Sequence, residues 1–420
     1  MKKLIAYVSF LALFATGCTS DEPAPSPDSS IEINHPRSIR TSAEAKTLAQ
    51  AIADARSGIS RNGNYIPRKV KDVKAVLSTT THARGNRDTL MYAVEYANNS
   101  GYALISAAKN GEPILAYTDK GTYDENNENP GFNYYLGKAK DYVRSLIDKP
   151  IISDSLYLDP SRPITLRSFI IDRINVEWGQ YFPEGIYFPN GKCGCVQTAI
   201  VQAMSYLGTP TQLTLTYPGK NKTNVYLNWK ELNNHKRSAN TQVEWNNMQN
   251  QCTVSAEAHN NLARLCRELG YRNGAIFDPE GTGTPTENAI STLKQILSPD
   301  KVTELKYLDN YTSFYSELKS VNGIALLEGF DYKTLGHWVG HVWICDGGEQ
   351  TTTRRKLIRY DGSIEIVETS TEYFHFNWGW CGKDNGYFYA GVFDNTKPTK
   401  EGSNSRYNFD FDVAYFIVSK

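Results

Sequence analysis

Apolar residues recur at helical spacing over residues 195–207. They are Val196, Ala199, Ile200, Ala203 and Leu207. Gly208 and Pro210 follow as stop signals, so the pattern predicts an amphipathic helix that begins at Cys195. The unpaired N–H groups and the positive dipole end of a helix start stabilise a thiolate over a thiol. Cys195 is therefore a candidate nucleophile, and a buried structural cysteine is the alternative.

Cys193 is a rival nucleophile two residues earlier. Cys195 is preferred because it follows Gly194 directly and opens the apolar repeat. Cys266 lies among apolar residues at helical spacing, and Cys345 continues an apolar strand, so both are expected in the core. Cys193 and Cys381 flank the proposed site, and the sequence leaves open whether they form a disulfide.

The C-terminal third has a strand pattern. Residues 340–347 predict a strand that carries His341 and ends in a turn. Residues 374–382 predict a second strand with Asn377 and a Gly-rich turn, and residues 384–388 predict a third strand. A cysteine on a helix with a distant histidine and asparagine on strands is the arrangement of papain-like cysteine peptidases. The expected class is α+β, with a helical part and an antiparallel sheet.

The region before residue 154 has a different pattern. Residues 41–44 form a capping box ahead of an apolar helical repeat that Gly58 would end. Residues 90–96, 102–106 and 113–117 read as strands, the first two joined by a turn at 98–101. A last helix has apolar residues on one face from Phe132 to Leu146. This predicts a small α+β unit ahead of the catalytic one.

Several segments together resemble the streptopain-like family of papain-like bacterial cysteine peptidases. They are 194–199, 340–343 with 346–347, 377–382 and 384–388. The resemblance implies that Cys195 is the nucleophile, that His341 activates it and that Asn377 orients His341, with Trp378 or Trp380 covering the pair. Trp178-Gly179-Gln180 stands where the family keeps its oxyanion-hole glutamine, which implies that role for Gln180.

Substrate contacts are expected in two places. Gly281-Thr282-Gly283 resembles part of the family's middle region, and Gly340 adjoins His341. His337 and His375 are competing histidines, and His375 should share the strand face of Asn377. A lengthened hairpin is predicted between residues 348 and 368, where it could reshape substrate binding.

Residues 101–106 and 113–117 resemble the prosegment of streptopain-like zymogens, which is related to Spi-type inhibitors. The expected organisation is a signal peptide with lipobox over 1–18, a tether over 19–40, an inhibitory prosegment-like domain over 41–154, a processing linker over 155–163 and a papain-like cysteine peptidase domain over 164–420. An independent binding domain is the alternative for 41–154. The Pro-rich stretch between Lys149 and Ile164 is the expected site of activating cleavage.

The N-terminal residues of the chain indicate where the protein is located. Lys2-Lys3 is followed by an apolar stretch too short to span a bilayer, and then by Ala15-Thr16-Gly17-Cys18. This resembles a bacterial lipobox, which implies lipidation of Cys18; an ordinary secretory signal is the alternative. Ser20-Asp21-Glu22 resembles the acidic signals that send some lipoproteins to the outer surface. We expect an exported protein, lipid-anchored to the bacterial outer membrane.

The charge and composition of the chain narrow the classes of binding partner that we expect. Lys plus Arg and Asp plus Glu each number 45, so the net charge is zero, and no basic patch points to nucleic acid. No Cys-x-x-Cys pair points to a metal, and the proposed chemistry needs no cofactor. The expected function is a secreted cysteine endopeptidase made as a zymogen, with protein or peptide substrates. A papain-like amidase or cell-wall peptidase, or a catalytically inactive surface-binding protein, are the alternatives.

Overall fold

The computed structural model describes 39–56, 68–78, 88–147, 155–158, 164–170, 174–217, 222–251, 253–279, 281–332, 338–359, 362–393 and 413–420. Residues 37–420 form one compact unit. The expected signal peptide, lipobox and tether, Gly58, Cys252, His337 and most of the processing linker lie outside the described residues. The expected domain boundaries therefore stay predictions.

Eight α-helices lie in the described part of the chain. They are α1 (Ser42–Arg56), α2 (Pro130–Ile147), α3 (Cys195–Leu207), α4 (Trp229–Leu232), α5 (Gln242–Gln249), α6 (Ala256–Arg272), α7 (Thr286–Ile296) and α8 (Tyr311–Ser320). The predicted helix over 195–207 is confirmed, and Gly208 ends it in the left-handed conformation with a φ of 68°. The capping box is also confirmed, because Thr41 and Glu44 exchange backbone-to-side-chain hydrogen bonds of 2.7 and 3.3 Å.

The strands of the main sheet come from the whole described chain. They are β1 (Val70–Leu77), β2 (Thr89–Tyr96), β3 (Tyr102–Ser106), β4 (Ile114–Thr118), β5 (Ser155–Leu158), β6 (Thr165–Ile170), β11 (Lys306–Tyr307), β12 (Gly323–Tyr332), β13 (Trp338–Ile358), β14 (Ile364–Asn377), β15 (Gly386–Tyr389) and β16 (Ala414–Ser419). Two small ribbons add β7 (Gln212–Leu215) with β8 (Thr223–Tyr226), and β9 (Ile276–Phe277) with β10 (Thr282–Gly283).

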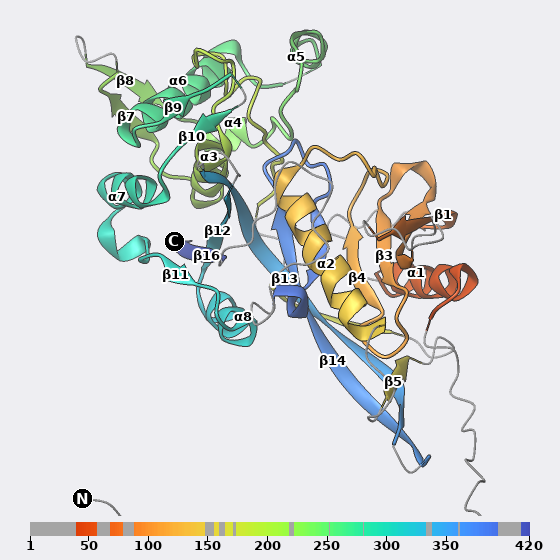
Figure 1. Ribbon diagram of the computed structural model, residues 1–420. Helices are drawn as coiled ribbons and strands as arrows, with labels where there is room; N and C mark the ends of the chain where they lie inside the picture. Colours follow the sequence, from red (N-terminus) through yellow and green to blue (C-terminus); the bar gives the residue numbers. More distant parts are fainter. Residues whose placement is uncertain are drawn as a thin grey trace, which may run out of the picture. The chain divides into compact units, whose positions relative to one another are not determined.

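The main sheet runs in the order β1-β2-β3-β4-β15-β14-β13-β12-β16-β11, and every pair along it is antiparallel. The first four strands belong to the expected prosegment. They join the expected peptidase domain where β4 pairs with β15, so one sheet spans both parts (Figure 1). The sequence predicted two separate units, but backbone pairing between edge strands merges their sheets.

Helices cover both faces of this sheet. On one face, α2 and α8 pack against aromatic residues of β13 and β14, such as Trp343 and Phe376. On the opposite face, α1 packs over β2 to β4, while α3, α6 and α7 form a second core with Val342 and Ile344 of β13. Helix α3, which carries Cys195, and helix α2 of the expected prosegment therefore lie on opposite sides of β13.

Two strand predictions need correction. β1 was not anticipated, because residues 70–77 alternate poorly and stay largely exposed. The expected turn at Asp346-Gly347 is wrong, because β13 continues to Ile358 through a bulge at that point. The result is the long β13–β14 hairpin that extends beyond the body of the sheet in Figure 1. The hairpin predicted over 348–368 is confirmed.

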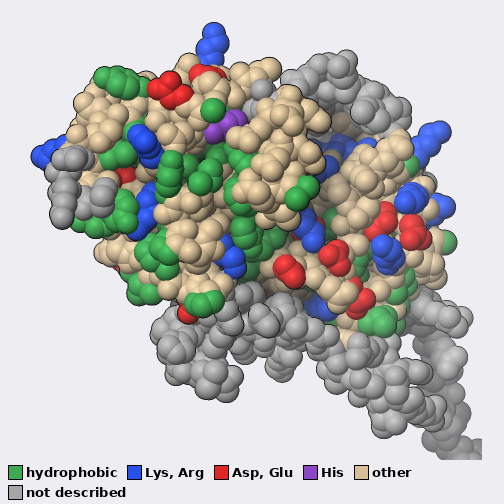
Figure 2. Space-filling view, turned by 90° about the horizontal axis from the view of Figure 1, so that it is seen from above, with side chains coloured by type: hydrophobic (Ala, Val, Ile, Leu, Met, Phe, Trp, Pro, Cys, Tyr) green, Lys and Arg blue, Asp and Glu red, His purple; other side chains and the backbone are tan. Residues whose placement is uncertain are grey.

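Cationic and anionic side chains are interspersed on the face drawn in Figure 2, and this face has no large patch of a single charge sign. In the described part of the chain, no helix combines the length and the apolar character needed to cross a membrane.

Candidate active site

Cys195 stands at the first position of α3. Gly194 precedes it with a φ of 88°, a conformation that favours glycine. A Cβ at Gly194 would lie 2.7 Å from the carbonyl oxygen of Thr282, so the backbone also approaches too closely for a side chain. Cys195 is partly exposed as a residue although its sulfur is desolvated, whereas Cys193 is fully buried. These positions support Cys195 over Cys193 as the nucleophile.

The thiol of Cys195 is not activated in this state. Desolvation raises its pKa to about 11, although the backbone N–H groups of Val342, Val196 and Cys195 itself oppose the shift. The expected helix-terminus effect is therefore present but is outweighed by burial.

The segment with Gln180 lies directly beside the nucleophile loop. The carbonyl oxygen of half-buried Gln180 accepts a 2.8 Å hydrogen bond from the backbone N–H of Cys193. Gly179 packs so closely against the sulfur of Cys381 that a side chain there would collide with it. Cys193 also lies against this segment, with its sulfur 4.0 Å from the carbonyl oxygen of Gly179.

The cysteines around the site are all reduced. Cys193 and Cys381 both adjoin Gly179 but carry free thiols, so the disulfide considered for them is not formed. The sulfur of Cys381 instead lies 3.2 Å from the Oδ1 of Asn240. Cys266 and Cys345 are fully buried, which confirms their predicted place in the core.

The predicted substrate loop lies next to Cys195. Thr282 donates a 2.7 Å hydrogen bond to the carbonyl oxygen of Lys192, and Asn190 donates to the carbonyl oxygen of Gly281 at 3.0 Å. A Cβ at Gly281 or at Gly283 would meet open space. This loop therefore borders the nucleophile without filling the space beside it. Gly340 is exposed on β13, next to His341.

His341 does not face the nucleophile in this structure. Its ring is almost completely buried, and its Nε2 lies 2.9 Å from the carbonyl oxygen of Trp378. Its ring also stacks near Trp343 at a centroid distance of 6.3 Å and meets the edge of Trp380 at 6.1 Å. Burial lowers the pKa of His341 to about 4, so the imidazole is neutral at physiological pH.

The prosegment helix touches this histidine. A Cβ at Gly131, in the first turn of α2, would lie 2.5 Å from the Trp378 ring and 2.8 Å from the Cδ2 of His341. The backbone of α2 therefore covers His341 and Trp378 directly. Trp378 is fully buried, and its indole N–H donates to the carbonyl oxygen of Asp384 at 3.0 Å.

Asn377 lies on the other side of the sheet from His341. Successive side chains of a strand point to opposite faces. Asn377 pairs with Ile344, which is three residues from His341, so the Asn377 side chain leaves the sheet opposite to the His341 ring. The contact through which Asn377 was expected to orient His341, a hydrogen bond from the ring to the Asn377 side-chain carbonyl, is not made in this structure.

The Asn377 amide instead supports the segment that leads to Gln180. Its Nδ2 donates to the carbonyl oxygen of Val176 at 3.0 Å and to the Oε1 of Gln202 at 2.9 Å. The same Gln202 oxygen accepts the backbone N–H of Trp178 at 3.0 Å. Gln202, on α3, was not anticipated. Its position in the helix repeat resembled any other buried site, and only the folded chain brings it to Asn377.

His375 has a different set of partners. Its ring nitrogens lie 2.6 Å from Asp346 Oδ1 and 3.0 Å from Asp119 Oδ2. The side chain shares the face of Asn377, as predicted, but it joins the prosegment to the peptidase part rather than to Cys195.

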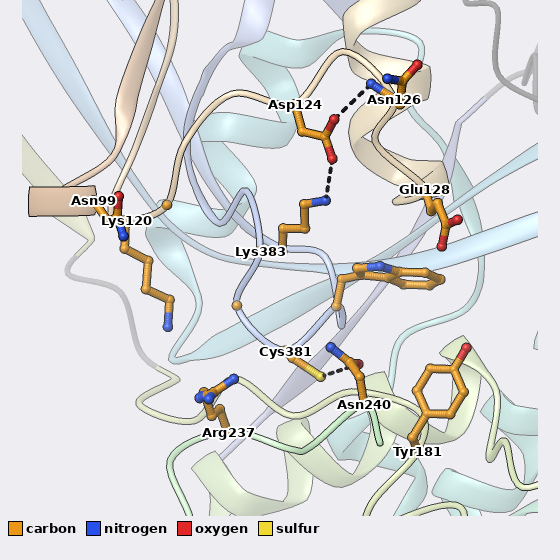
Figure 3. A pocket seen from close by; sticks show the side chains of 13 residues that line it. Asn99, Lys120, Asp124, Asn126, Glu128, Tyr181, Arg237, Asn240, Cys381 and Lys383 are labelled. Atoms are coloured by element: carbon orange, nitrogen blue, oxygen red, sulfur yellow. Dashed lines mark hydrogen bonds and ion pairs between the residues drawn. The ribbon is translucent and has the colours of Figure 1, made fainter. Parts of the chain in front are cut away.

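A cavity of about 750 Å³ opens between the prosegment and the candidate site. Lys120, Asp124 and Glu128 line it from the prosegment side, and Figure 3 shows them opposite Tyr181, Arg237, Asn240 and the loop that carries Cys381. Asp124 crosses the cavity to Lys383 at 3.2 Å. Because Tyr181 follows Gln180, this cavity adjoins the proposed oxyanion segment.

A thiol on the first turn of a helix, with a histidine and an asparagine on adjoining antiparallel strands, is the arrangement of elements found in papain-like cysteine peptidases. The comparisons agree. Residues 176–388 match the model described as Peptidase C10 family, and residues 41–143 match the model described as Spi protease inhibitor. This chain belongs to the Peptidase C10 family, and it is a cysteine peptidase made as a zymogen with an inhibitor-like prosegment.

Individual relatives are distant. The streptopain of Streptococcus pyogenes is 19% identical over 316 residues, which cover 69% of this chain and 71% of that protein. The thiol protease/hemagglutinin PrtT of Porphyromonas gingivalis is 22% identical over 80% of this chain and 38% of that protein. A solved fragment of Prevotella intermedia prointerpain A has a TM-score of 0.47 and 18% identity, covering 82% of this chain and 97% of its own.

Among the residues with described positions, no group of three or more His, Cys, Asp and Glu side chains is placed to hold a metal ion.

Proposed function

We propose that this protein is an exported, lipid-anchored endopeptidase in which Cys195 attacks the scissile carbonyl. The observation that carries the proposal is the place of Cys195, a partly exposed residue, at the start of α3 beside the segment that holds Gln180. Gln180 and the backbone N–H of Cys195 would bind the oxyanion, at roughly 3 kcal/mol per donor in comparable sites. His341 would accept the thiol proton and then protonate the leaving amine.

Latency would follow from the place of His341. In the precursor its ring lies under Gly131 and bonds to the carbonyl of Trp378, on the far side of β13 from the α3 core. The raised pKa of Cys195 and the lowered pKa of His341 leave both groups neutral at pH 7, without an ion pair. Cleavage between Lys149 and Ile164 would release α2 and let the imidazole reach the thiol.

Activity on unfolded protein tests the proposal most directly. The secreted chain should digest an unfolded protein after processing, and a thiol-directed inhibitor should stop it. Cys195→Ala should abolish cleavage, whereas Cys193→Ala should retain it. Loss of turnover in the Cys193 variant alone, with its circular dichroism unchanged, would contradict the assignment. Cleavage of cell-wall peptides but not of unfolded protein would instead indicate a papain-like amidase or cell-wall peptidase.

The lipid anchor has a separate test. Cells fed a labelled fatty acid should transfer the label to the wild-type protein and not to Cys18→Ser. The variant should also leave the membrane fraction. A labelled Cys18→Ser protein would contradict the anchor and leave the peptidase proposal untouched.

A further inference from the structure

The Trp178–Phe182 segment, which carries Gln180, rests on the loop over residues 235–239. Phe182 and Ala239 exchange backbone hydrogen bonds of 3.1 and 3.0 Å. The indole N–H of Trp178 donates to the carbonyl oxygen of His235 at 2.7 Å. These bonds hold both ends of the segment, and the peptide N–H of Gly179 lies between them.

That peptide N–H has a dedicated acceptor. Gly179 donates to the Oγ of Ser238 at 2.8 Å, and the Ser238 hydroxyl donates to the Oε1 of Glu184 at 2.7 Å. Ser238 and Glu184 are both completely buried. The single hydroxyl proton of Ser238 is thus engaged by Glu184, which leaves a lone pair directed at Gly179.

Gly179 has little freedom to move away from this acceptor. The sulfur of Cys381 lies against one side of it, and the Ser238 Cβ would be 3.7 Å from a Cβ built at this position. A peptide packed against these two side chains and fixed by a buried hydrogen bond sets the direction of the next residue. That residue is Gln180.

A buried carboxyl group is an unusual partner for a single serine hydroxyl. Desolvation raises the pKa of Glu184 to about 8, against the opposing hydrogen bond from Ser238. The carboxyl is therefore mostly neutral at pH 7, and a neutral amide should replace it as an acceptor. His235 Nε2 lies 3.9 Å from Glu184 Oε1, and burial lowers the pKa of this histidine to about 3, so it adds no charge there.

We propose that Ser238 and Glu184 are positioning residues for catalysis, which fix the Gly179 peptide so that the side chain of Gln180 is directed at the oxyanion. The inference rests on the proposed oxyanion role of Gln180. It adds a chain of two buried side chains, of which Ser238 comes from a part of the sequence that carries none of the catalytic motifs.

The test uses the full chain, processed by tagged wild-type enzyme that is then removed. Ser238→Ala should lower kcat about tenfold, because a small displacement of an oxyanion donor weakens transition-state binding, and should leave KM nearly unchanged. The alkylation rate of Cys195 should stay at the wild-type value, since alkylation forms no oxyanion. Ser205→Ala is the matched control, because Ser205 is another buried serine, bonded at 2.5 Å to Asn233.

Glu184 provides a second pair of variants. Glu184→Gln keeps an acceptor for Ser238 and should retain most of kcat, whereas Glu184→Ala should lower kcat as Ser238→Ala does. Counting reactive Cys195 thiols by alkylation normalises each rate to folded enzyme, so partial misfolding does not imitate the effect. Equal kcat values for Glu184→Gln and Glu184→Ala would overturn the role of Glu184.

The double variant separates this inference from the proposed function. In a Gln180→Ala background, Ser238→Ala should have no further effect on kcat, because its target is gone. If Gln180→Ala itself leaves kcat unchanged, the oxyanion role of Gln180 fails. If Gln180→Ala slows turnover while Ser238→Ala does not, or if the two losses multiply, the positioning role is wrong.

Discussion

The prosegment meets the peptidase part at two contacts that differ in chemistry. At the active-site contact, Gly131 presents bare backbone to Trp378 and His341. At the hairpin contact, buried polar and charged groups of β13 and β14 pair with groups of the prosegment. One contact covers His341, the proposed base, and the other supplies paired charges far along the sheet.

The hairpin contact is built on one face of two strands. Glu112 of the prosegment pairs with Arg355 and accepts hydrogen bonds from Thr371 at 2.9 Å and from Tyr373 at 3.0 Å. Each of these four residues is nearly or fully buried. The lengthened hairpin, expected to shape substrate binding, thus places this polar face against the prosegment.

Two more pairs extend the hairpin contact toward the site. Arg56 pairs with Glu349 at 2.8 Å, and Asp119 pairs with His375 at 3.0 Å. Charged side chains are well solvated when they become exposed, so a polar contact suits two parts of the chain that would separate in the proposed activation. If the Gly131 contact inhibits as proposed, inhibition and attachment depend on different residues and should be separable by mutation.

The largest expected effect concerns the active-site contact. At pH 7 a thiol with a pKa near 11 is ionised to about one part in ten thousand, so the fresh precursor should be alkylated very slowly at Cys195. The rate should rise continuously toward pH 11, whereas the processed enzyme should react fast near neutral pH. Iodoacetamide kinetics against pH measure both. Cys195→Ala gives the background, and a step below pH 7 in the precursor would contradict the separation of His341 from Cys195.

Breaking the hairpin contact should have the next largest effect. Arg355→Met leaves Glu112 buried without its partner, which should lower the free energy of unfolding of the precursor by about 3–5 kcal/mol. Chemical denaturation measures the loss, and a free prosegment should inhibit the processed variant more weakly.

The neighbouring arginine is the matched control for that variant. Arg354 pairs with Glu368, and both side chains are more than half exposed. Arg354→Met should therefore change stability by about 0.5 kcal/mol or less. Glu112→Leu combined with Arg355→Met should recover much of the loss, because an apolar pair can replace a buried ion pair. Equal losses in Arg354→Met and Arg355→Met would argue against a buried charge contact.

A side chain at Gly131 should separate the two contacts. Gly131→Val forces Trp378 or His341 to move, at a cost of about 1–3 kcal/mol for overpacking. We expect turnover by the uncleaved precursor to rise, while the hairpin pairs keep the prosegment bound. Precursor activity and prosegment retention on a sizing column are the two measurements. If the prosegment is released and turnover does not rise before its release, the two contacts act as one.

The smallest effect is expected at Asp119. Burial alone would raise its pKa, but the hydrogen bond and charge of His375, with Arg56 and Arg68, hold the pKa well below its usual range. A carboxyl group whose pKa is lowered in the complex strengthens binding at pH values above its ordinary pKa of about 3.9. This contribution is lost as the pH falls from there toward the lowered pKa.

The affinity of the free prosegment for the processed enzyme should therefore decline below about pH 4. A free prosegment with Asp119→Asn should bind the processed enzyme a few-fold more weakly at neutral pH. Its affinity should then lack this part of the decline below about pH 4. Inhibition constants across pH measure both. Identical pH profiles for the wild type and Asp119→Asn would assign the acid sensitivity to another group.

Much of the local structure follows from the sequence. The apolar repeat and Gly208 define α3 at both ends, the capping box places the start of α1, and the chemistry-bearing motifs indicate the family. β1 was missed because its exposed residues give little alternation. The turn expected at Asp346 is wrong, because pairing with β6 and β14 continues β13 through a sequence that resembles a turn.

The arrangement of the site needed the folded chain. The sequence by itself determined that Cys195 opens a helix and that His341 and Asn377 lie on strands, since spacing along one element is local. Only the tertiary structure decided that His341 and Asn377 point to opposite faces, that Gln202 and Ser238 support the Gln180 segment, and that Gly131 covers the histidine. Those facts depend on strand register and on contacts between residues far apart in the chain, which no local pattern encodes.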